Sequence, residues 1–198
     1  MFPLSTVAFP GEPVPLQVFE PRYRAMVAEV LAGDCRFGIT LITRGHEVGG
    51  GDERARVGTL MEVSGARPEP DGRWFIVAEG QARFRVQDWY PDAPYPRARV
   101  ELLNVPADHL AEGQLERAHR AVTQLQALHA ECQPGPAAGI TFELDDDPDV
   151  ALWSLCARAP IAPSLRQALL EEPGAQQRAE LLVGACEASS AMLLQALA

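Results

Sequence analysis

The basic side chains of this chain exclude two kinds of enzymatic chemistry. All 17 of its basic residues are arginines, so the sequence contains no lysine. A P-loop needs the lysine of its G-x-x-x-x-G-K-[ST] motif to reach the nucleotide phosphates, and a serine–lysine dyad needs a lysine amine as its base. We therefore expect neither ATP hydrolysis nor serine–lysine peptidase activity, and we predict that the chain is not an enzyme.

Other residues that could do chemistry have the wrong spacing for it. No serine lies in a G-x-S-x-G elbow, so no hydrolase nucleophile is indicated. The four cysteines are Cys35, Cys132, Cys156 and Cys186. They form no C-x-x-C pair, and we expect buried thiols rather than zinc ligands or disulfides. The sequence therefore predicts no catalytic residue, no cofactor and no metal site.

The run Phe19, Glu20, Pro21, Arg22 and Tyr23 carries the strongest local signal for binding. A structural interpretation explains most of it, because Pro21 suits the first position of a helix and Glu20 favours the positive helix N-terminus. In that interpretation Phe19 and Tyr23 are core side chains. In the functional interpretation this helix start borders a groove, where Arg22 binds acidic groups or peptide carbonyls.

A second candidate contact is Arg83, Phe84 and Arg85, which lie in a run that alternates arginine with apolar residues. We expect this run to form a strand beside the helix start described above. Concave apolar surface with a few polar groups tends to occur at seams between subdomains. We therefore predict that a ligand binds where the first half of the chain meets the second, between these two runs.

Short β-forming runs cut by glycine and proline fill the chain to about residue 105. The predicted strands cover residues 14–19, 35–43, 56–66, 73–78, 82–89 and 97–103. One helix interrupts them, beginning at Pro21 and ending at Gly33. Residues 45–52, which are rich in glycine, are predicted as a hairpin loop. Strands of this kind favour a mostly antiparallel barrel or sandwich over a parallel sheet.

The apolar period becomes helical in the second half of the chain. The predicted helices cover 108–133, 148 to at least 156, 164–172 and about 176 toward the end. Asp147 is expected to cap the second helix, and Ser164 with Gln167 to form a capping box for the third. The predicted fold class is therefore α+β, with a β-rich subdomain over 1–105 and a helical bundle subdomain over 106–198.

The distribution of charge bears on the partner. The net charge is −10, with 14 acidic and 12 basic residues before residue 106 and 13 and 5 from there on. Because a nucleic-acid binder needs a positive surface, this balance favours a protein partner over RNA. No apolar run is long enough to span a membrane, and prolines interrupt the start where a secretory signal would lie. We expect a cytoplasmic protein.

Five segments of the first half resemble, in order and spacing, the motifs of the Lon N-terminal, or substrate-binding, domain family. They are FPLSTVAFPGEPVPLQVFEPRYRAMV (2–27), FGITLITRGHEVGG (37–50), VGTLMEV (57–63), DGRWFIVAEGQARFRV (71–86) and PYPRARVELL (94–103). The leucine-rich end of the chain, including RAELL at 178–182, is similar to the helical subdomain of that family. The resemblance implies a PUA-like pseudo-barrel followed by helices, and the binding of polypeptides rather than chemistry.

Two classes of function stay open at this point. The resemblance favours a module that binds unfolded polypeptide or a protein partner, as an adaptor or regulator of proteolysis. The alternative is a PUA-like RNA-binding protein, suggested by fold analogy and by Arg22, Arg24, Arg83 and Arg85. The leucines of the last helix also allow two interpretations, either bundle core or an exposed apolar stripe for self-association.

Overall fold

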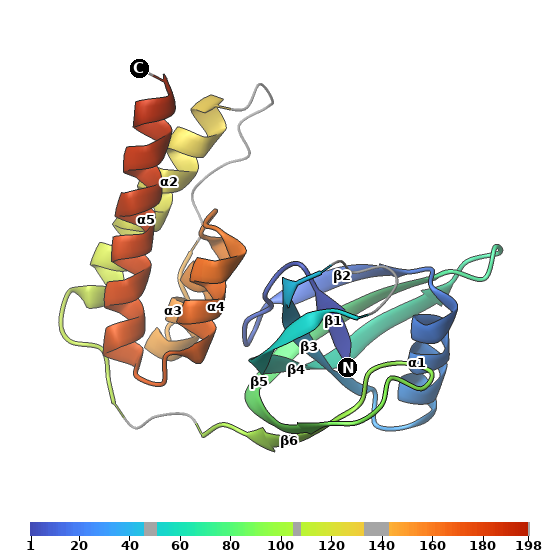
Figure 1. Cartoon of the computed structure of the whole chain (residues 1–198). Coiled ribbons are helices and arrows are strands. Elements are labelled where there is room, and N and C mark those ends of the chain that lie inside the picture. Colours follow the sequence, from blue (N-terminus) through green and yellow to red (C-terminus); the bar gives the residue numbers. More distant parts are fainter. Residues whose placement is uncertain (46–50, 105–107, 133–142, 198) are drawn as a thin grey trace. The chain divides into compact units, whose positions relative to one another are not determined.

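The computed structural model describes residues 1–45, 51–104, 108–132 and 143–197, and these form two compact units. Met1–Asn104 form the first, here the β unit, and Val105–Ala198 the second, here the helical unit. The described strands all lie in the β unit, together with one helix, and the remaining helices lie in the helical unit (Figure 1). The predicted α+β class is confirmed. Most of the expected hairpin loop at 45–52 lies outside the described residues.

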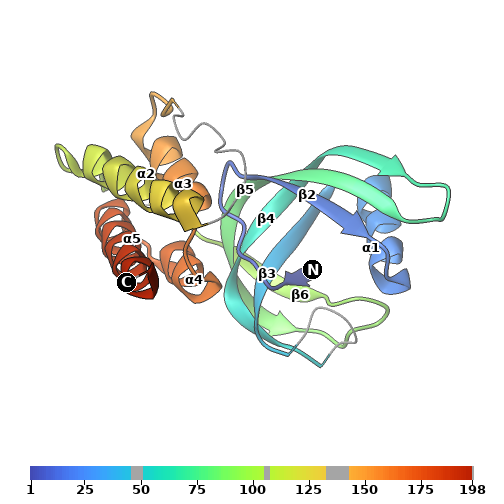
Figure 2. The ribbon, with the colours of Figure 1, turned by 90° about the horizontal axis from the view of Figure 1, so that it is seen from above.

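The β unit is built from one curled sheet. Its strands are β1 (Phe2–Leu4), β2 (Pro13–Val18), β3 (Arg36–Arg44), β4 (Glu53–Pro68), β5 (Trp74–Trp89) and β6 (Ala98–Leu102). The strand order is β1-β3-β4-β5-β2, and β6 also pairs with β5. β2 lies beside the first half of β5 and β6 beside its second half. The described pairs are antiparallel except β1 with β3, and the sheet curls as Figure 2 shows.

Helix α1 (Pro21–Ala32) packs on this sheet through one apolar face. Its buried residues Tyr23, Met26 and Val27 recur at helical spacing, and they join a core that includes Phe37 and Ile76. Pro21 opens the helix because its fixed φ suits the first turn, and Gly33 follows its last residue. The predicted helix is therefore confirmed, and its packing face anchors one side of the sheet.

Two strands differ from those predicted. The runs 73–78 and 82–89 were expected to be separate, but they form the single strand β5, which passes through Gly80. Gly80 is needed for close approach rather than for a turn, because a Cβ there would meet the backbone carbonyl oxygen of Phe9. β1 was not predicted, since a three-residue strand that contains Pro3 has little β signal of its own.

The helical unit contains α2 (Gln114–Cys132), α3 (Pro148–Arg158), α4 (Pro163–Glu171) and α5 (Ala175–Leu197). α2 and α5 lie side by side and run in the same direction (Figures 1 and 2). The Gln176 side chain at the start of α5 donates from Nε2 to the carbonyl oxygen of His109, in the segment before α2, at 2.7 Å. None of the described helices is both long enough and apolar enough to cross a membrane.

The two predicted helix caps had different outcomes. Asp147 caps α3 as expected, because its side chain accepts a hydrogen bond from the Asp149 N–H at 2.9 Å. The capping box at Ser164 is wrong: α4 begins one residue earlier, at Pro163, and Ala162 precedes it without a side-chain cap. Proline at the first position already fixes φ and leaves one fewer N–H to be satisfied.

Candidate functional site

The helix start predicted as a binding contact is partly buried and partly exposed. Tyr23 belongs to the core, as the structural interpretation expected, and burial raises its pKa to about 12. Phe19 is 55% exposed, so that interpretation is wrong for this residue. Glu20 forms an ion pair with Arg22 at 3.1 Å, and the Arg22 guanidinium lies 4.5 Å from the centre of the Tyr23 ring. This segment therefore presents one exposed aromatic ring beside a paired guanidinium.

The predicted contact on β5 presents one of its three side chains to solvent. Arg83 and Phe84 are buried, whereas Arg85 is exposed. The Phe84 ring lies so close to the backbone of β3 and β4 that a Cβ added to Gly38 would come within 2.8 Å of it. Phe84 is thus part of the packing, and Arg85 is the member of this group that can reach a ligand. The predicted binding concavity between the two units stays a prediction.

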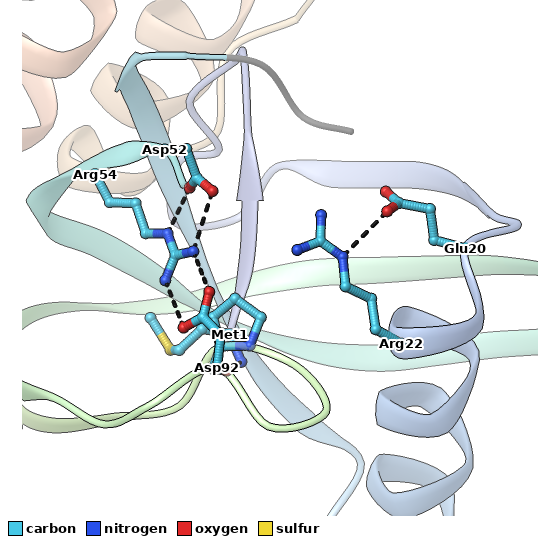
Figure 3. A network of polar contacts seen from close by, with 7 residues as sticks. Met1, Glu20, Arg22, Asp52, Arg54 and Asp92 are labelled. Carbon is cyan, nitrogen blue, oxygen red and sulfur yellow. Dashed lines mark hydrogen bonds and ion pairs between the residues drawn. The ribbon is translucent and has the colours of Figure 1, made fainter. Parts of the chain in front are cut away.

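A polar network in the β unit is centred on Arg54 and was not predicted from the sequence. The Arg54 side chain is 8% exposed and lies between Asp52 and Asp92 (Figure 3). Its Nη2 donates to Asp52 Oδ1 at 3.1 Å and to Asp92 Oδ2 at 2.6 Å. The guanidinium also lies 4.9 Å from the centre of the Trp89 ring. Arg54 therefore ties the start of β4 to the end of β5 and the segment that follows it.

The pKa values of this network follow from its hydrogen bonds. The bond from Arg54 lowers the pKa of the Asp52 carboxyl, and the more distant Arg22 lowers it further. Burial alone would lower the pKa of Arg54, but the bonds to Asp52 and Asp92 outweigh it and raise that pKa. Asp52 and Arg54 are therefore both charged at neutral pH, and the role that this arrangement supports is structural.

The best candidate for a binding site is a pocket of about 800 Å³ in the β unit. α1, the start of β3 and the segment between β5 and β6 form its walls. Its apolar lining includes the accessible Met1 and Tyr90, together with the buried core residues Met26 and Phe37. Methionine side chains adapt to ligands of different shape, and aromatic rings supply contact area at low entropic cost. The lining suits apolar side chains of varied shape.

Charged groups form the rim of this pocket. Arg97 Nη2 donates to Glu29 Oε1 at 2.7 Å, and the Tyr95 hydroxyl donates to the other oxygen of the same carboxylate. The Tyr95 bond, with the nearby Arg97, lowers the pKa of Glu29. The Met1 amine donates to the Pro96 carbonyl oxygen at 2.9 Å, and burial, followed by Arg54 and Arg97, lowers its pKa to about 5. The pocket thus has an apolar interior and an ionic rim.

Two cysteines of the helical unit, Cys156 and Cys186, are buried. Burial raises the pKa of Cys156 to about 12 and that of Cys186 to about 11, so neither thiol forms a thiolate at neutral pH. Across the described ranges, no group of three or more His, Cys, Asp or Glu side chains is placed to hold a metal ion.

The apolar residues of the last helix, α5, are partly buried in the helical unit and partly exposed. Leu182 and Val183 are buried in the helical unit, whereas Leu181, Met192 and Leu194 are exposed. Leu181 and Met192 are eleven positions apart and share one helical face, whereas Leu194 points in a different direction. Two of the three exposed residues therefore lie on one face of α5, and self-association through this helix stays a prediction.

Sequence reasoning missed the pocket because its walls come from three segments far apart in the chain. One signal was present in residues 90–97, which read YPDAPYPR. Three prolines and two tyrosines within eight residues indicate a stiff aromatic segment, and such a segment suits the wall of a binding site. The Glu29 to Arg97 pair spans 68 positions and leaves no local pattern.

Comparisons with known proteins agree on one family. The profile of the family described as the ATP-dependent protease La (LON) substrate-binding domain matches residues 1–185. A LON peptidase N-terminal domain and RING finger protein of Schizosaccharomyces pombe is 29% identical over 110 residues, which is 50% of this chain and 23% of that protein. A Lon protease of Syntrophus aciditrophicus is 30% identical over 100 residues, which is 48% of this chain and 13% of that protein.

Solved structures extend the similarity over nearly the whole chain. A Lon N-terminal domain protein from Xanthomonas campestris matches with a TM-score of 0.66 and 26% identity, covering 92% of this chain and 95% of its own. The N-terminal domain of a Mycobacterium avium complex Lon protease has the same fold, with a TM-score of 0.60, 16% identity, and coverage of 93% and 96%. The chain spans less than a quarter of the S. pombe relative. On these matches, the chain belongs to the LON substrate-binding domain family.

Proposed function

We propose that this chain is a non-catalytic module that binds unfolded polypeptide and acts as an adaptor or regulator of proteolysis. The observation that carries the proposal is the pocket between α1 and the segment from Tyr90 to Ala98. Met1 and Tyr90 offer apolar contacts to the side chains of a ligand, supported by the buried Met26 and Phe37, and the ionic rim offers hydrogen bonds to a peptide backbone. Membership of a family described as substrate-binding supports the same role.

The proposed contact surface includes the pocket and the exposed residues of the two sequence-predicted runs. In the pocket these are Tyr90 and Arg97, which are both exposed at its rim. Outside the pocket the exposed residues are Phe19 and Arg85. Glu20 and Arg22 lie half-buried beside Phe19. Tyr23, Arg83 and Phe84 then support the surface from below rather than touch the ligand. Aromatic and arginine side chains are the residues that most often dominate binding energy.

The alternative of RNA binding has less support. Of the twelve arginines in the β unit, at least eight form ion pairs with carboxylates. A guanidinium that is already paired displaces few counterions when it approaches a phosphate, because its own carboxylate repels the phosphate. Arg22, which suggested RNA binding from the sequence, is one of the paired residues.

The test measures binding of a permanently unfolded protein, reduced and carboxymethylated α-lactalbumin, by fluorescence anisotropy. We expect Arg97→Ala and Tyr90→Ala each to weaken binding by about 1 to 2 kcal/mol, the usual cost of removing an interface contact. The matched control for Arg97 is Arg73→Ala. Both arginines form ion pairs at 2.7 Å and their side chains are 49% and 50% exposed, but Arg73 lies outside the pocket lining.

Three outcomes separate the possibilities. Loss of affinity in the pocket variants but not in Arg73→Ala supports the pocket as the site. Loss in Phe19→Ala or Arg85→Ala instead would move the site to the sequence-predicted runs. If the wild-type chain binds no unfolded protein, the proposed function is wrong. Thermal unfolding of each variant shows whether a lost affinity reflects lost structure.

A further inference from the structure

β6 presents a free backbone edge in the β unit. Leu103 donates its N–H to the Arg83 carbonyl oxygen at 2.9 Å, and Arg97 accepts from the Tyr90 N–H at 2.9 Å. The odd-numbered residues of β6 therefore point their N–H and C=O groups toward β5, as the register of the pair requires. The backbone groups of Ala98, Val100 and Leu102 point the other way, where the sheet order of the described strands places no neighbour.

Two other free edges of the sheet, those of β2 and β1, are protected against pairing. Gly80 donates its N–H to the Glu12 carbonyl oxygen, so the backbone groups of the even-numbered residues of β2 face β5. The backbone groups of the odd-numbered residues Pro13, Pro15 and Gln17 therefore lie on the outer edge of β2. Two of these three residues have no N–H to offer. β1 has three residues and includes Pro3. Prolines and very short strands are the devices by which proteins block unwanted strand addition.

The β6 edge lacks such protection and carries apolar side chains. The strand ARVEL contains neither proline nor glycine, and Val100 and Leu102 are 37% and 55% exposed on one face. Arg99 and Glu101 on the other face contact Asp88 and Gln87 of β5. Their charges are thus directed along the sheet toward β5 and leave the outer edge open.

The edge also leads into the pocket described above. Ala98, the first residue of β6, lines the pocket together with Arg97. A strand added along Ala98, Val100 and Leu102 would therefore have one end at the pocket, where a side chain could enter. The spacing of outward N–H and C=O groups, about 7 Å for every second residue, matches another extended backbone and no small ligand.

From these contacts we infer that an extended, apolar segment of polypeptide binds by adding a strand to the free edge of β6. The backbone ladder supplies affinity that is independent of sequence, and Val100, Leu102 and the pocket select alternate apolar side chains. The inference rests on the proposed polypeptide-binding function and specifies how the ligand is held.

The test compares Val100→Pro with Val100→Ala in the full chain, with carboxymethylated α-lactalbumin as the probe. Both substitutions remove the Val100 side chain, but only proline removes the outward N–H, and neither touches a bond to β5. We expect proline to weaken binding about fivefold to tenfold more than alanine, the equivalent of one lost hydrogen bond. In the wild-type chain, saturating probe should slow hydrogen exchange of the Val100 and Leu102 amides about tenfold.

The outcomes distinguish this inference from the proposed function. If the wild-type chain binds the probe, and Arg97→Ala weakens binding, but the two amides stay unprotected and proline equals alanine, strand addition is wrong and the pocket stands. If the wild-type chain binds no probe, both fail. Protection of the amides that rises with protein concentration and accompanies a dimer in sedimentation overturns the inference, because the occupant is then a second copy.

Discussion

At the scale of single residues, Arg54 links parts of the β unit that are distant in sequence. One guanidinium satisfies two carboxylates and stacks near the Trp89 ring, which is the geometry that suits arginine and not lysine. Asp52 and Arg54 are nearly buried, with 3% and 8% exposed, so their charges depend on each other for solvation. Removing one partner leaves the other charged and desolvated.

We predict that Arg54→Ala lowers the free energy of unfolding by about 3 kcal/mol, because it leaves a buried carboxylate unpaired. Asp92→Asn should cost about 1 kcal/mol or less, since Asp92 is more exposed and Arg54 keeps Asp52 as its partner. Urea unfolding at neutral pH checks both values. Equal costs for the two variants would contradict the central role of Arg54.

The same network predicts a dependence on pH. Because the folded-state pKa of Asp52 is lowered, its stabilisation is complete above the unfolded-state value of about 3.9. It is then lost as the pH falls through the lower folded-state value. We expect Asp52→Asn to reduce the acid dependence of the unfolding free energy between about pH 4 and pH 2 relative to the wild-type chain. Parallel curves for the two proteins would show that Asp52 does not titrate as described.

Little of this residue-scale picture could be predicted from the sequence. Glu20 and Arg22, in the predicted run at Phe19 to Tyr23, form an ion pair. A local pattern can indicate such a pair because its partners are only two positions apart. The Arg54 to Asp92 contact joins residues 38 positions apart, and no local pattern distinguishes Arg54 from its neighbours. The burial of Arg83 opposes the usual exposure of arginine, so an alternating strand pattern misplaced it.

At the scale of secondary structure, glycines set how closely the strands and loops approach. A Cβ on Gly58 would lie 2.6 Å from the Phe84 ring and 2.8 Å from Thr40 Cγ2, and would also meet the Ile39 carbonyl oxygen. Gly184 lies in α5 with no atom within 4 Å of such a Cβ. A side chain at Gly58 would therefore be crowded, whereas one at Gly184 would not. The two positions form a matched pair for substitution by alanine.

We predict that Gly58→Ala destabilises the chain by about 2 to 3 kcal/mol, because Phe84 and the β3 backbone must both shift. Gly184→Ala should instead stabilise it by up to about 1 kcal/mol, the helical preference of alanine over glycine. Thermal and urea unfolding of the two variants give the signs. A destabilised Gly184→Ala variant, or a neutral Gly58→Ala variant, would contradict the packing described.

A buried arginine joins three helices in the helical unit. Arg178 of α5 donates to carbonyl oxygens at the end of α4, from Nε to Leu169 at 3.2 Å and from Nη2 to Glu172 at 2.6 Å. Its guanidinium lies 3.8 Å from the centre of the Trp153 ring of α3. A cation at a helix C-terminus is favoured by the helix dipole, and burial lowers the pKa of Arg178.

We predict that Arg178→Lys destabilises the helical unit by about 2 kcal/mol although it keeps the charge, because an ammonium cannot bond both carbonyls and stack on Trp153 at once. The exposed Arg158→Lys substitution is the control and should change stability by less than about 0.5 kcal/mol. Urea unfolding followed by tryptophan fluorescence measures both. Equal stability of Arg178→Lys and the wild-type chain would show that charge alone suffices.

The sequence predicted helices better than strands because helical signals are local. Asp147 and Pro21 mark helix starts within the helix itself, and both predictions are confirmed. The unbroken course of β5 depends on its pairing with β4, which reaches from Val57 to Pro68. From the sequence alone, Gly80 in the middle of this strand predicts a turn. Its pairing with β4 and its close approach to the Phe9 carbonyl oxygen are visible only in the structure.

At the scale of the whole molecule, charge separates the two classes of partner. The chain carries a net charge of −10, and most arginines of the β unit are already paired with its own carboxylates. A phosphate backbone would have to compete with those carboxylates and approach against the field of the whole chain.

We therefore predict that the wild-type chain binds single-stranded RNA more weakly than about 10 µM at physiological salt, within the range of non-specific association. The double substitution Glu62→Gln and Asp88→Asn should strengthen that binding severalfold, because it frees Arg36 and Arg99 from their partners and removes two negative charges. Electrophoretic mobility shift and anisotropy titrations at several salt concentrations measure both proteins. Submicromolar binding by the wild-type chain, with an affinity that falls steeply as salt rises, would instead favour the RNA-binding alternative. An unchanged affinity in the double variant would mean that these ion pairs are not what keeps RNA away.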